Sequence, residues 1–214
     1  MKAPVYFIRH GRTVGNLEHR YVGATDEPLC EEGVKELQQC RRWLEKHFFA
    51  EGFAMPGRVY VSPMLRCRQS ALILFPTAKQ SLIHDFREMN FGEFEYKNYA
   101  ELAGDMRYQA YIDSGGNTDF PAAETQAHFR RRIGEAFRQC IAHNFENVGA
   151  SMADRPEEPF VFCVHGGTIM AIFDAYSVPH RDYFEWQVSN ASGFYGVLEF
   201  GKNCMYLEKI EKFF

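Results

Sequence analysis

The sequence predicts an α/β protein with a doubly wound, mostly parallel sheet, flanking helices and an inserted helical cap. Short, unbroken apolar runs alternate along the chain with longer segments whose apolar residues recur at helical spacing. Two of the runs, Val5–Ile8 and Phe160–Val164, are each followed within three residues by a histidine and a glycine. Such uninterrupted runs are typical of central parallel strands that are buried on both faces.

The first part of the chain alternates between predicted strands and predicted helices. Val5–Ile8 is the first strand, and a helix follows Pro28, where an apolar stripe runs from Val34 to Phe48 at helical spacing. Val59–Val61 is the second predicted strand and leads into another helix. Ser81–His84 is the third predicted strand. This alternation predicts parallel strands joined by crossover helices.

The rest of the chain adds the cap and an edge hairpin. Residues 86–149 contain no good strand and are expected to form a mostly helical cap, within which a stripe from Phe129 to Ile141 predicts a helix that packs on the sheet. After the strand at residues 160–164, residues 194–200 and 204–210 are expected to pair as an antiparallel hairpin. With no repeat and no linker, residues 1–214 are expected to form a single domain.

The composition narrows the classes of protein that the chain can belong to. The 214 residues are 46% hydrophobic and 24% charged, as in an ordinary soluble globular protein. The net charge of −4 disfavours binding to nucleic acid or to an anionic membrane by bulk charge. No apolar run approaches the length of a membrane span. The six cysteines have no zinc-site spacing, so we expect a reduced, cytoplasmic protein.

Arginines and histidines follow three of the predicted strands. Arg9 and His10 follow the first strand, Arg66 lies in the first turns of the helix after the second, and His165 follows the strand at residues 160–164. In open α/β sheets, ligands bind beyond the carboxyl ends of the strands, where these side chains converge. Guanidinium groups, imidazoles and helix N-terminal amides together suit a phosphoryl group. Taken singly, a strand-end histidine is more often structural than catalytic.

Four sequence blocks, in this order, make the pattern much more specific. The chain resembles the histidine phosphatase superfamily, the phosphoglycerate-mutase-like proteins, in the blocks Phe7-Ile8-Arg9-His10-Gly11-Arg12-Thr13, Ser62-Pro63-Met64-Leu65-Arg66-Cys67-Arg68-Gln69-Ser70-Ala71, Phe86-Arg87-Glu88-Met89-Asn90-Phe91-Gly92-Glu93 and Val164-His165-Gly166-Gly167-Thr168. The probabilities of independent chance matches multiply, so the four blocks together are far more specific than any one of them.

The resemblance implies a role for each of these residues. His10 would be the nucleophile that becomes a phosphohistidine, and Glu88 the proton donor. Arg9, Arg66 and His165 would hold the phosphoryl oxygens, with Asn16 assisting. Gly166, Arg12 and Tyr21 are further candidates for contacts with phosphate or substrate. Arg12 stands where the family commonly has glutamate.

Physical chemistry agrees with these implied roles. An imidazole must be neutral to attack phosphorus, and neighbouring guanidinium groups disfavour a second positive charge on His10. Fixed donors around the transferring group stabilise its charge without a metal or a cofactor. Glu93 and Glu95 lie close to Glu88 in sequence, and the family spacing favours Glu88 as the proton donor.

The resemblance leaves the substrate open. The block from Arg20 to Leu29 is similar to the α-ribazole phosphatase and small phosphatase branch, which implies hydrolysis of a small-molecule phosphate ester, with α-ribazole phosphate as a candidate. A phosphoglycerate mutase is the alternative, although the sequence contains no evident second anchor for a carboxylate or phosphate. A non-catalytic module that binds a phosphorylated ligand or a protein is another, since fold alone does not fix function. The oligomeric state is open.

Other conspicuous residues are expected to have no role in the site. Arg130, Arg131 and Arg132 are predicted to lie mostly on the solvent face of their helix. The histidines other than His10 and His165 have no metal-ligand spacing and are expected to be structural or exposed.

Overall fold

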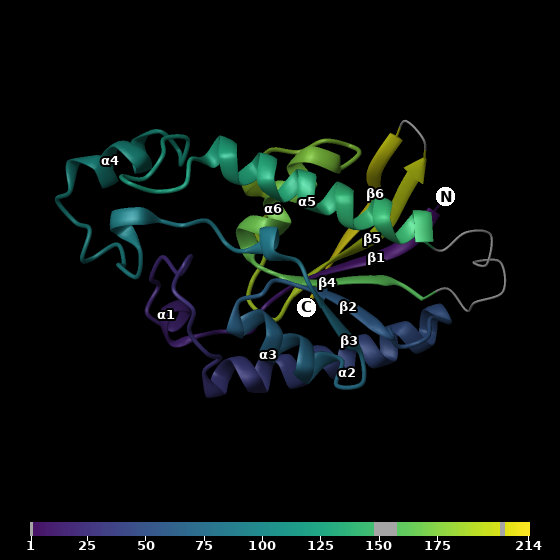
Figure 1. The fold of residues 1–214 in the computed structure, drawn as a ribbon. Helices are drawn as coiled ribbons and strands as arrows, with labels where there is room; N and C mark the ends of the chain where they lie inside the picture. The colour runs from purple at the N-terminus through teal and green to yellow at the C-terminus, as the bar shows by residue number, and fades with distance from the viewer. Residues whose placement is uncertain (1, 148–157, 202–203) are drawn as a thin grey trace.

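The computed structural model describes residues 2–147, 158–201 and 204–214 and contains a six-stranded sheet with helices on both faces (Figure 1). The strand order is β3-β2-β4-β1-β5-β6. β1, β2, β3 and β4 run parallel to one another, β5 runs antiparallel to β1, and β6 runs antiparallel to β5. The strands are β1 Lys2–Arg9, β2 Arg58–Val61, β3 Lys79–Leu82, β4 Phe160–Val164, β5 Gly193–Gly201 and β6 Cys204–Phe213. The predicted fold class, with its edge hairpin, is confirmed.

Most strand predictions agree with the structure to within a few residues, and β3 differs most. It ends at Leu82, two residues before the predicted end, and His84 belongs to the short 3₁₀ helix η1 (His84–Phe86). β3 is one of the two edge strands, pairs with β2, and is only partly buried along its length. A half-exposed edge strand needs no apolar run, so its bounds are weakly encoded. The predicted turn residues 202–203 lie outside the described residues.

Four longer helices form the two layers. α2 (Glu31–Glu51) and α3 (Leu65–Leu74) cover one face of the sheet, and α5 (Gln126–Asn147) and α6 (Gly166–Tyr176) cover the other (Figure 1). The two shorter helices are α1 (Val14–Leu17) and α4 (Met106–Asp113). No helix in the described part of the chain combines the length and apolar character needed to cross a membrane.

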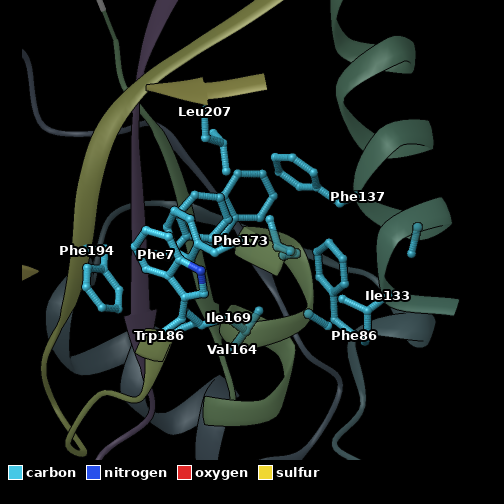
Figure 2. Close-up of a cluster of buried hydrophobic side chains, with 14 of the residues drawn as sticks. Phe7, Phe86, Ile133, Phe137, Val164, Ile169, Phe173, Trp186, Phe194 and Leu207 are labelled. Atoms are coloured by element: carbon cyan, nitrogen blue, oxygen red, sulfur yellow. The ribbon is translucent and has the colours of Figure 1, made fainter. Parts of the chain in front are cut away.

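The alternation of β1 divides the core into two clusters. Val5 and Phe7 point toward α5 and α6, whereas Tyr6 and Ile8 point toward α2 and α3. On the first side, Phe173 of α6 lies among several rings, with centroid distances of 5.0 Å to Phe7, 4.9 Å to Trp186 and 5.2 Å to Phe194 (Figure 2). These contacts join α6 to β1, to β5 and to the 3₁₀ helix η4 (Tyr183–Trp186).

The first turn of α2 packs directly on the loop that follows β1. A Cβ atom at Gly33 would collide with the backbone of Arg12, and a Cβ at Gly11 would stand 2.9 Å from the Gly33 carbonyl oxygen. Only glycine allows this close approach, which fixes the loop carrying His10 against the helix. Cys30 caps α2, its sulfur accepting a hydrogen bond from the Gly33 amide at 3.4 Å.

Residues 87–125 extend beyond the carboxyl ends of the parallel strands, together with α1 (Figure 1). They contain the 3₁₀ helix η2 (Gly92–Phe94) and α4, and they bury a small core of Phe94, Leu102 and Phe120. In contrast, Ile133 and Phe137 of α5 belong to the main core beside Phe7. We therefore propose that the cap comprises residues 87–125 of one domain, and that α5, at the end of the expected 86–149 insertion, belongs to the sheet layer.

Candidate active site

The candidate site lies where β1 and β4, adjacent and parallel, end. The chain leaves β1 toward α2 on one face and leaves β4 into α6 on the other, which makes this a switch point of the sheet. A cavity of about 950 Å³ opens there. Seven of the residues predicted for the site line this cavity: Arg9, His10, Arg12, Asn16, Tyr21, Glu88 and Gly166. Arg66 and His165 are fully buried beside them.

His10 is held in one orientation by the backbone. Its Nδ1 lies 2.7 Å from the Gly11 carbonyl oxygen, and because a carbonyl only accepts, Nδ1 carries the proton and Nε2 keeps its lone pair. The side chain is 3% exposed, so water scarcely stabilises a charged imidazolium. This burial, together with the charges of Arg66 and Arg9, places the pKa of His10 well below its ordinary value. The lowered pKa favours the neutral imidazole at physiological pH, which is the form that a nucleophile would need.

Two arginines flank His10: Arg66 is fully buried, and Arg9 is half-buried at the cavity. The guanidinium of Arg66 donates to the carbonyl oxygens of Thr25 at 2.7 Å and Gly23 at 3.0 Å, and that of Arg9 donates to Val188 at 2.8 Å. The Nε of each arginine is buried and has no hydrogen-bond partner. Among the described residues, no carboxylate forms an ion pair with either arginine. Both cations therefore retain donors and charge for an anion.

His165, at the start of α6, completes the buried cluster. Its ring lies edge-on to that of His10, at an interplanar angle of 68° with centroids 5.2 Å apart, and its Nε2 is 2.7 Å from the Ser62 hydroxyl. Burial, followed by the charge of Arg66, lowers the pKa of His165 well below its ordinary value. The sulfur of Cys67 lies 3.5 Å from the same Nε2. Burial raises the pKa of Cys67 to about 12, so this thiol is protonated.

Glu88 differs from its two acidic neighbours in its environment. Its carboxylate accepts the amides of Met89 at 3.0 Å and Gly167 at 3.1 Å, and burial raises its pKa. Glu93 is exposed and pairs with Arg107. Glu95 accepts backbone amides of the 23–25 loop and has a structural role. Of the three, only Glu88 combines a position in the cavity wall with a tendency to stay protonated.

The remaining predicted site residues are placed more loosely. Thr13 is the N-cap of α1, and the Asn16 side chain completes the capping box by accepting a hydrogen bond from the Thr13 amide. The same side chain accepts a hydrogen bond from the Asn190 side-chain amide at 3.2 Å. Arg12 pairs with Glu36 at 3.2 Å and is 44% exposed, so its charge is partly satisfied and screened. The Tyr21 hydroxyl lies 3.2 Å from that of Tyr108. Gly166 lies beside Arg9, where a Cβ would stand 3.4 Å from the arginine Nε.

Several residues of the site lie outside the sequence blocks that predicted it. The loop at residues 187–190 lines the cavity, where the carbonyl of Val188 accepts from Arg9 and the Asn190 amide donates to the His10 carbonyl at 3.0 Å. The polar run ahead of the predicted strand at 194–200 was the only available hint. Lys212 and His19 also line the cavity. The latter was expected to be structural or exposed; it is exposed, at the cavity.

The expectation that Arg130 to Arg132 are solvated is wrong for two of the three. Arg130 lies 3.9 Å from the ring centroid of Tyr183 and pairs with Asp174, and Arg132 pairs with Glu124. Only Arg131 is exposed. Long arginine side chains reach sideways across the helix to these partners. In the part of the chain that the structure describes, no group of three or more His, Cys, Asp or Glu side chains could hold a metal ion. All six cysteines are free thiols.

Comparison with known proteins defines the class that the fold and the site indicate. The model of the histidine phosphatase superfamily, branch 1, matches residues 5–211. The chain therefore belongs to the histidine phosphatase superfamily.

Individual relatives are more distant. The chain is 28% identical over 144 residues to a protein of Proteus mirabilis and 25% identical over 142 residues to one of Erwinia tasmaniensis, both named probable phosphoglycerate mutase GpmB. Each match covers 64% of this chain and 63% of the relative. Among solved structures, mycobacterial glucosyl-3-phosphoglycerate phosphatase has a TM-score of 0.77 at 21% identity, covering 96% of each chain. The α-ribazole phosphatase of Shigella flexneri has a TM-score of 0.73 at 16% identity, covering 96% of this chain and 94% of its own.

Proposed function

We propose that this protein is a metal-independent phosphomonoester hydrolase that works through a phosphohistidine on His10 and acts on a small-molecule phosphate. The observation that carries the proposal is the pair of arginines beside His10, of which Arg66 is fully buried and Arg9 is half-buried at the cavity. Each has an unpartnered Nε, and both lie beside His10, whose pKa is lowered first by burial and then by the charges of Arg66 and Arg9. Guanidinium groups that are largely withdrawn from water are stabilised by an anion that binds between them.

In the first step, Nε2 of His10 attacks phosphorus, a P–N bond forms, and the bond from phosphorus to the ester oxygen breaks. Arg9, Arg66 and His165 bind the three oxygens on which negative charge is spread. Glu88 transfers its proton to the departing alkoxide, which leaves as the alcohol. The raised pKa of Glu88 supports this role because it keeps the proton available.

In the second step, water attacks the phosphohistidine. The Glu88 carboxylate, now ionised, accepts a proton from that water, and the P–N bond breaks. Inorganic phosphate is released, neutral His10 is regenerated, and Glu88 is protonated again. All groups in this cycle are side chains or water, so we expect activity to persist in excess chelator.

The substrate is proposed only at the level of its class. α-Ribazole phosphate is a candidate, in keeping with the name of the Shigella flexneri structural neighbour. The curated relatives named as mutases make 3-phosphoglycerate the natural comparison. Each compound is assayed for released inorganic phosphate and for an isomeric phosphate ester, which distinguishes hydrolysis from mutase activity.

The test is a rapidly quenched reaction with p-nitrophenyl phosphate, followed by mapping of the phosphorylated residue. We expect phosphate on His10 that survives base and is lost in acid, and we expect His10→Ala to abolish turnover. His19→Asn is the control, since His19 also lines the cavity and asparagine tolerates its left-handed backbone (φ 55°). Acid-stable phosphate on a serine or aspartate, or full activity of His10→Ala, would falsify the mechanism.

A further inference from the structure

One side of the cavity is lined by aromatic rings from three separate parts of the chain. They comprise Tyr21 from the loop after α1, four rings from the cap and from α5, and two from η4. The seven rings are Tyr21, Phe91, Tyr111, Phe120, Phe129, Tyr183 and Phe184, and we call them the aromatic wall. Met89 and Met170 line the same cavity. None of the sequence motifs accounts for this wall.

The rings of the wall support one another. Phe120 lies with its centroid 5.3 Å from Tyr21, 5.4 Å from Phe91 and 4.3 Å from Tyr111. Tyr21 and Phe91 are edge-to-face at 5.3 Å. Because Phe120 is itself buried in the core of the cap, these rings are held in fixed orientations. A ligand would meet a preformed apolar surface and would not have to order it.

The cap and η4 close on each other at Gly116. This residue has a φ of 83°, and a Cβ there would stand 2.7 Å from the Phe184 ring and 3.3 Å from the Tyr111 hydroxyl. Glycine is therefore required by both the backbone conformation and the close contact. The contact joins the rings of the cap to those of η4 and makes the wall continuous.

The wall begins at the proposed proton donor. A Cβ at Gly167 would collide with the Glu88 carboxylate and would stand 3.2 Å from the Phe129 ring. The carboxylate and the ring therefore meet over the same glycine. A proton donor must face the oxygen of the leaving group, so the rings beside Glu88 face the rest of that group.

Two cations next to the wall, Arg20 and Arg130, are already paired. Arg20 bonds to Glu18 and Glu101, and Arg130 pairs with Asp174 while lying against the Tyr183 ring. At the phosphoryl end, by contrast, Arg9 and Arg66 have no acidic partner in the described part of the chain. The cavity is thus cationic where the phosphoryl group would bind and aromatic where the leaving group would lie.

We infer that the aromatic wall binds a flat aromatic group on the alcohol of the substrate. The preferred substrates would be phosphate monoesters of alcohols that carry an aromatic ring, rather than small polar esters such as glycerate or sugar phosphates. This inference rests on the proposed function, since it identifies the leaving-group side of the cavity from Glu88. Edge-to-face packing of a ligand ring against the wall supplies affinity beyond simple burial of apolar area.

The test uses one series of phosphonates, which cannot be hydrolysed, and the matching phosphates. Binding of 3-phenylpropylphosphonate, 3-cyclohexylpropylphosphonate and propylphosphonate is measured by calorimetry, and kcat/KM is measured for the three phosphate esters. The reacting oxygen is the same alkoxide throughout, so differences report on the wall. We expect the phenyl compound to bind about tenfold or more tightly than the propyl compound, from burial of its ring. It should exceed the cyclohexyl compound by about 2- to 10-fold, from aromatic packing.

Two substitutions locate the effect. Phe91→Leu and Phe184→Leu should each lower the preference for phenyl over propyl several-fold. Tyr99→Leu, which changes an exposed aromatic residue of the cap outside the wall, should leave the preference unchanged. The wild-type comparison does not depend on the folding of any variant.

The outcomes separate this inference from the proposed activity. If 3-phenylpropylphosphonate binds preferentially but no ester is hydrolysed, the inference about the aromatic wall is supported and the proposed hydrolase activity is rejected. Hydrolysis of all three esters with equal kcat/KM overturns the wall and leaves the hydrolase in place. Equal binding of the phenyl and cyclohexyl compounds, or binding of neither, also overturns it.

Discussion

His10 and Glu88 show how burial in one site shifts the pKa values of two titratable groups in opposite directions. Burial disfavours the charged form of each, so the pKa of the imidazole falls and that of the carboxyl rises. The free imidazole and the protonated carboxyl are the two forms that phosphoryl transfer to histidine would use. The same residues in water would hold the opposite forms over much of the acidic range.

The pH dependence of kcat/KM follows from these directions. His10 must be neutral, so activity should be lost only when the pH falls well below the ordinary histidine range. Glu88 must be protonated to assist a poor leaving group, so activity on alkyl phosphates should decline as the pH rises through its raised pKa. In Glu88→Gln, the decline on the alkaline side should vanish from the profile while the acidic limb remains. An unchanged alkaline limb in this variant would assign that titration to another group.

The quality of the leaving group gives a second measure of Glu88. An alkoxide needs a proton in the transition state, whereas p-nitrophenolate leaves without one. We expect Glu88→Gln to lose about 10²- to 10⁴-fold in phosphoryl transfer from an alkyl phosphate, and far less from p-nitrophenyl phosphate. Pre-steady-state kinetics with Glu93→Gln as the matched control measure both. Equal losses on the two substrates would reject Glu88 as the acid.

At the scale of elements, the junction between α2 and the loop after β1 is a contact too close for any side chain. Gly33→Ala would push a methyl group into the backbone of Arg12. We expect it to lower the free energy of unfolding by about 1–3 kcal/mol, as overpacking does, and to reduce activity by displacing His10. Urea unfolding and kcat/KM on p-nitrophenyl phosphate test both effects.

Gly134→Ala is the control for that substitution. Gly134 is also a buried helical glycine, but an added Cβ would have its nearest neighbours at 3.7–3.9 Å, an ordinary contact. Alanine should therefore be neutral or stabilise α5 by up to about 1 kcal/mol. Similar losses in both variants would show that the close approach at Gly33 is unimportant.

Elements differ in how far the sequence predicts them. β1 and β4 are buried on both faces and must be apolar throughout, so their runs are visible without a structure, whereas the edge strand β3 has no such requirement. The residues that follow β1 and β4 were predicted to converge because the motif and the parallel sheet indicate it. The aromatic wall and Asn190 could not be found in this way. They come together only through the tertiary path of the cap and of η4, and their residues show no shared period.

For the whole molecule, stability should depend on the ring cluster between the sheet and α6. Phe173 contacts Phe7, Trp186 and Phe194, which belong to three different elements (Figure 2). We expect Phe173→Ala to lower the free energy of unfolding by about 3–5 kcal/mol, measured by chemical denaturation. Phe49→Ala, at a side chain that is 87% exposed, should change it by less than about 0.5 kcal/mol. A loss below about 1 kcal/mol in Phe173→Ala would mean that the core closes around the missing ring.

The loop from Tyr21 to Thr25 serves both ends of the cavity. Its carbonyl groups at Gly23 and Thr25 hold Arg66, and its amides at the same two residues are held by Glu95. The Tyr21 side chain, at the start of the loop, belongs instead to the aromatic wall. In the proposed mechanism, backbone groups of this loop would support the phosphoryl end of the cavity, and one of its side chains would line the leaving-group end. Mutation replaces side chains and leaves peptide groups in place. In directed evolution, substitution of Tyr21 could therefore change which substrates bind, while the backbone hydrogen bonds to Arg66 are kept.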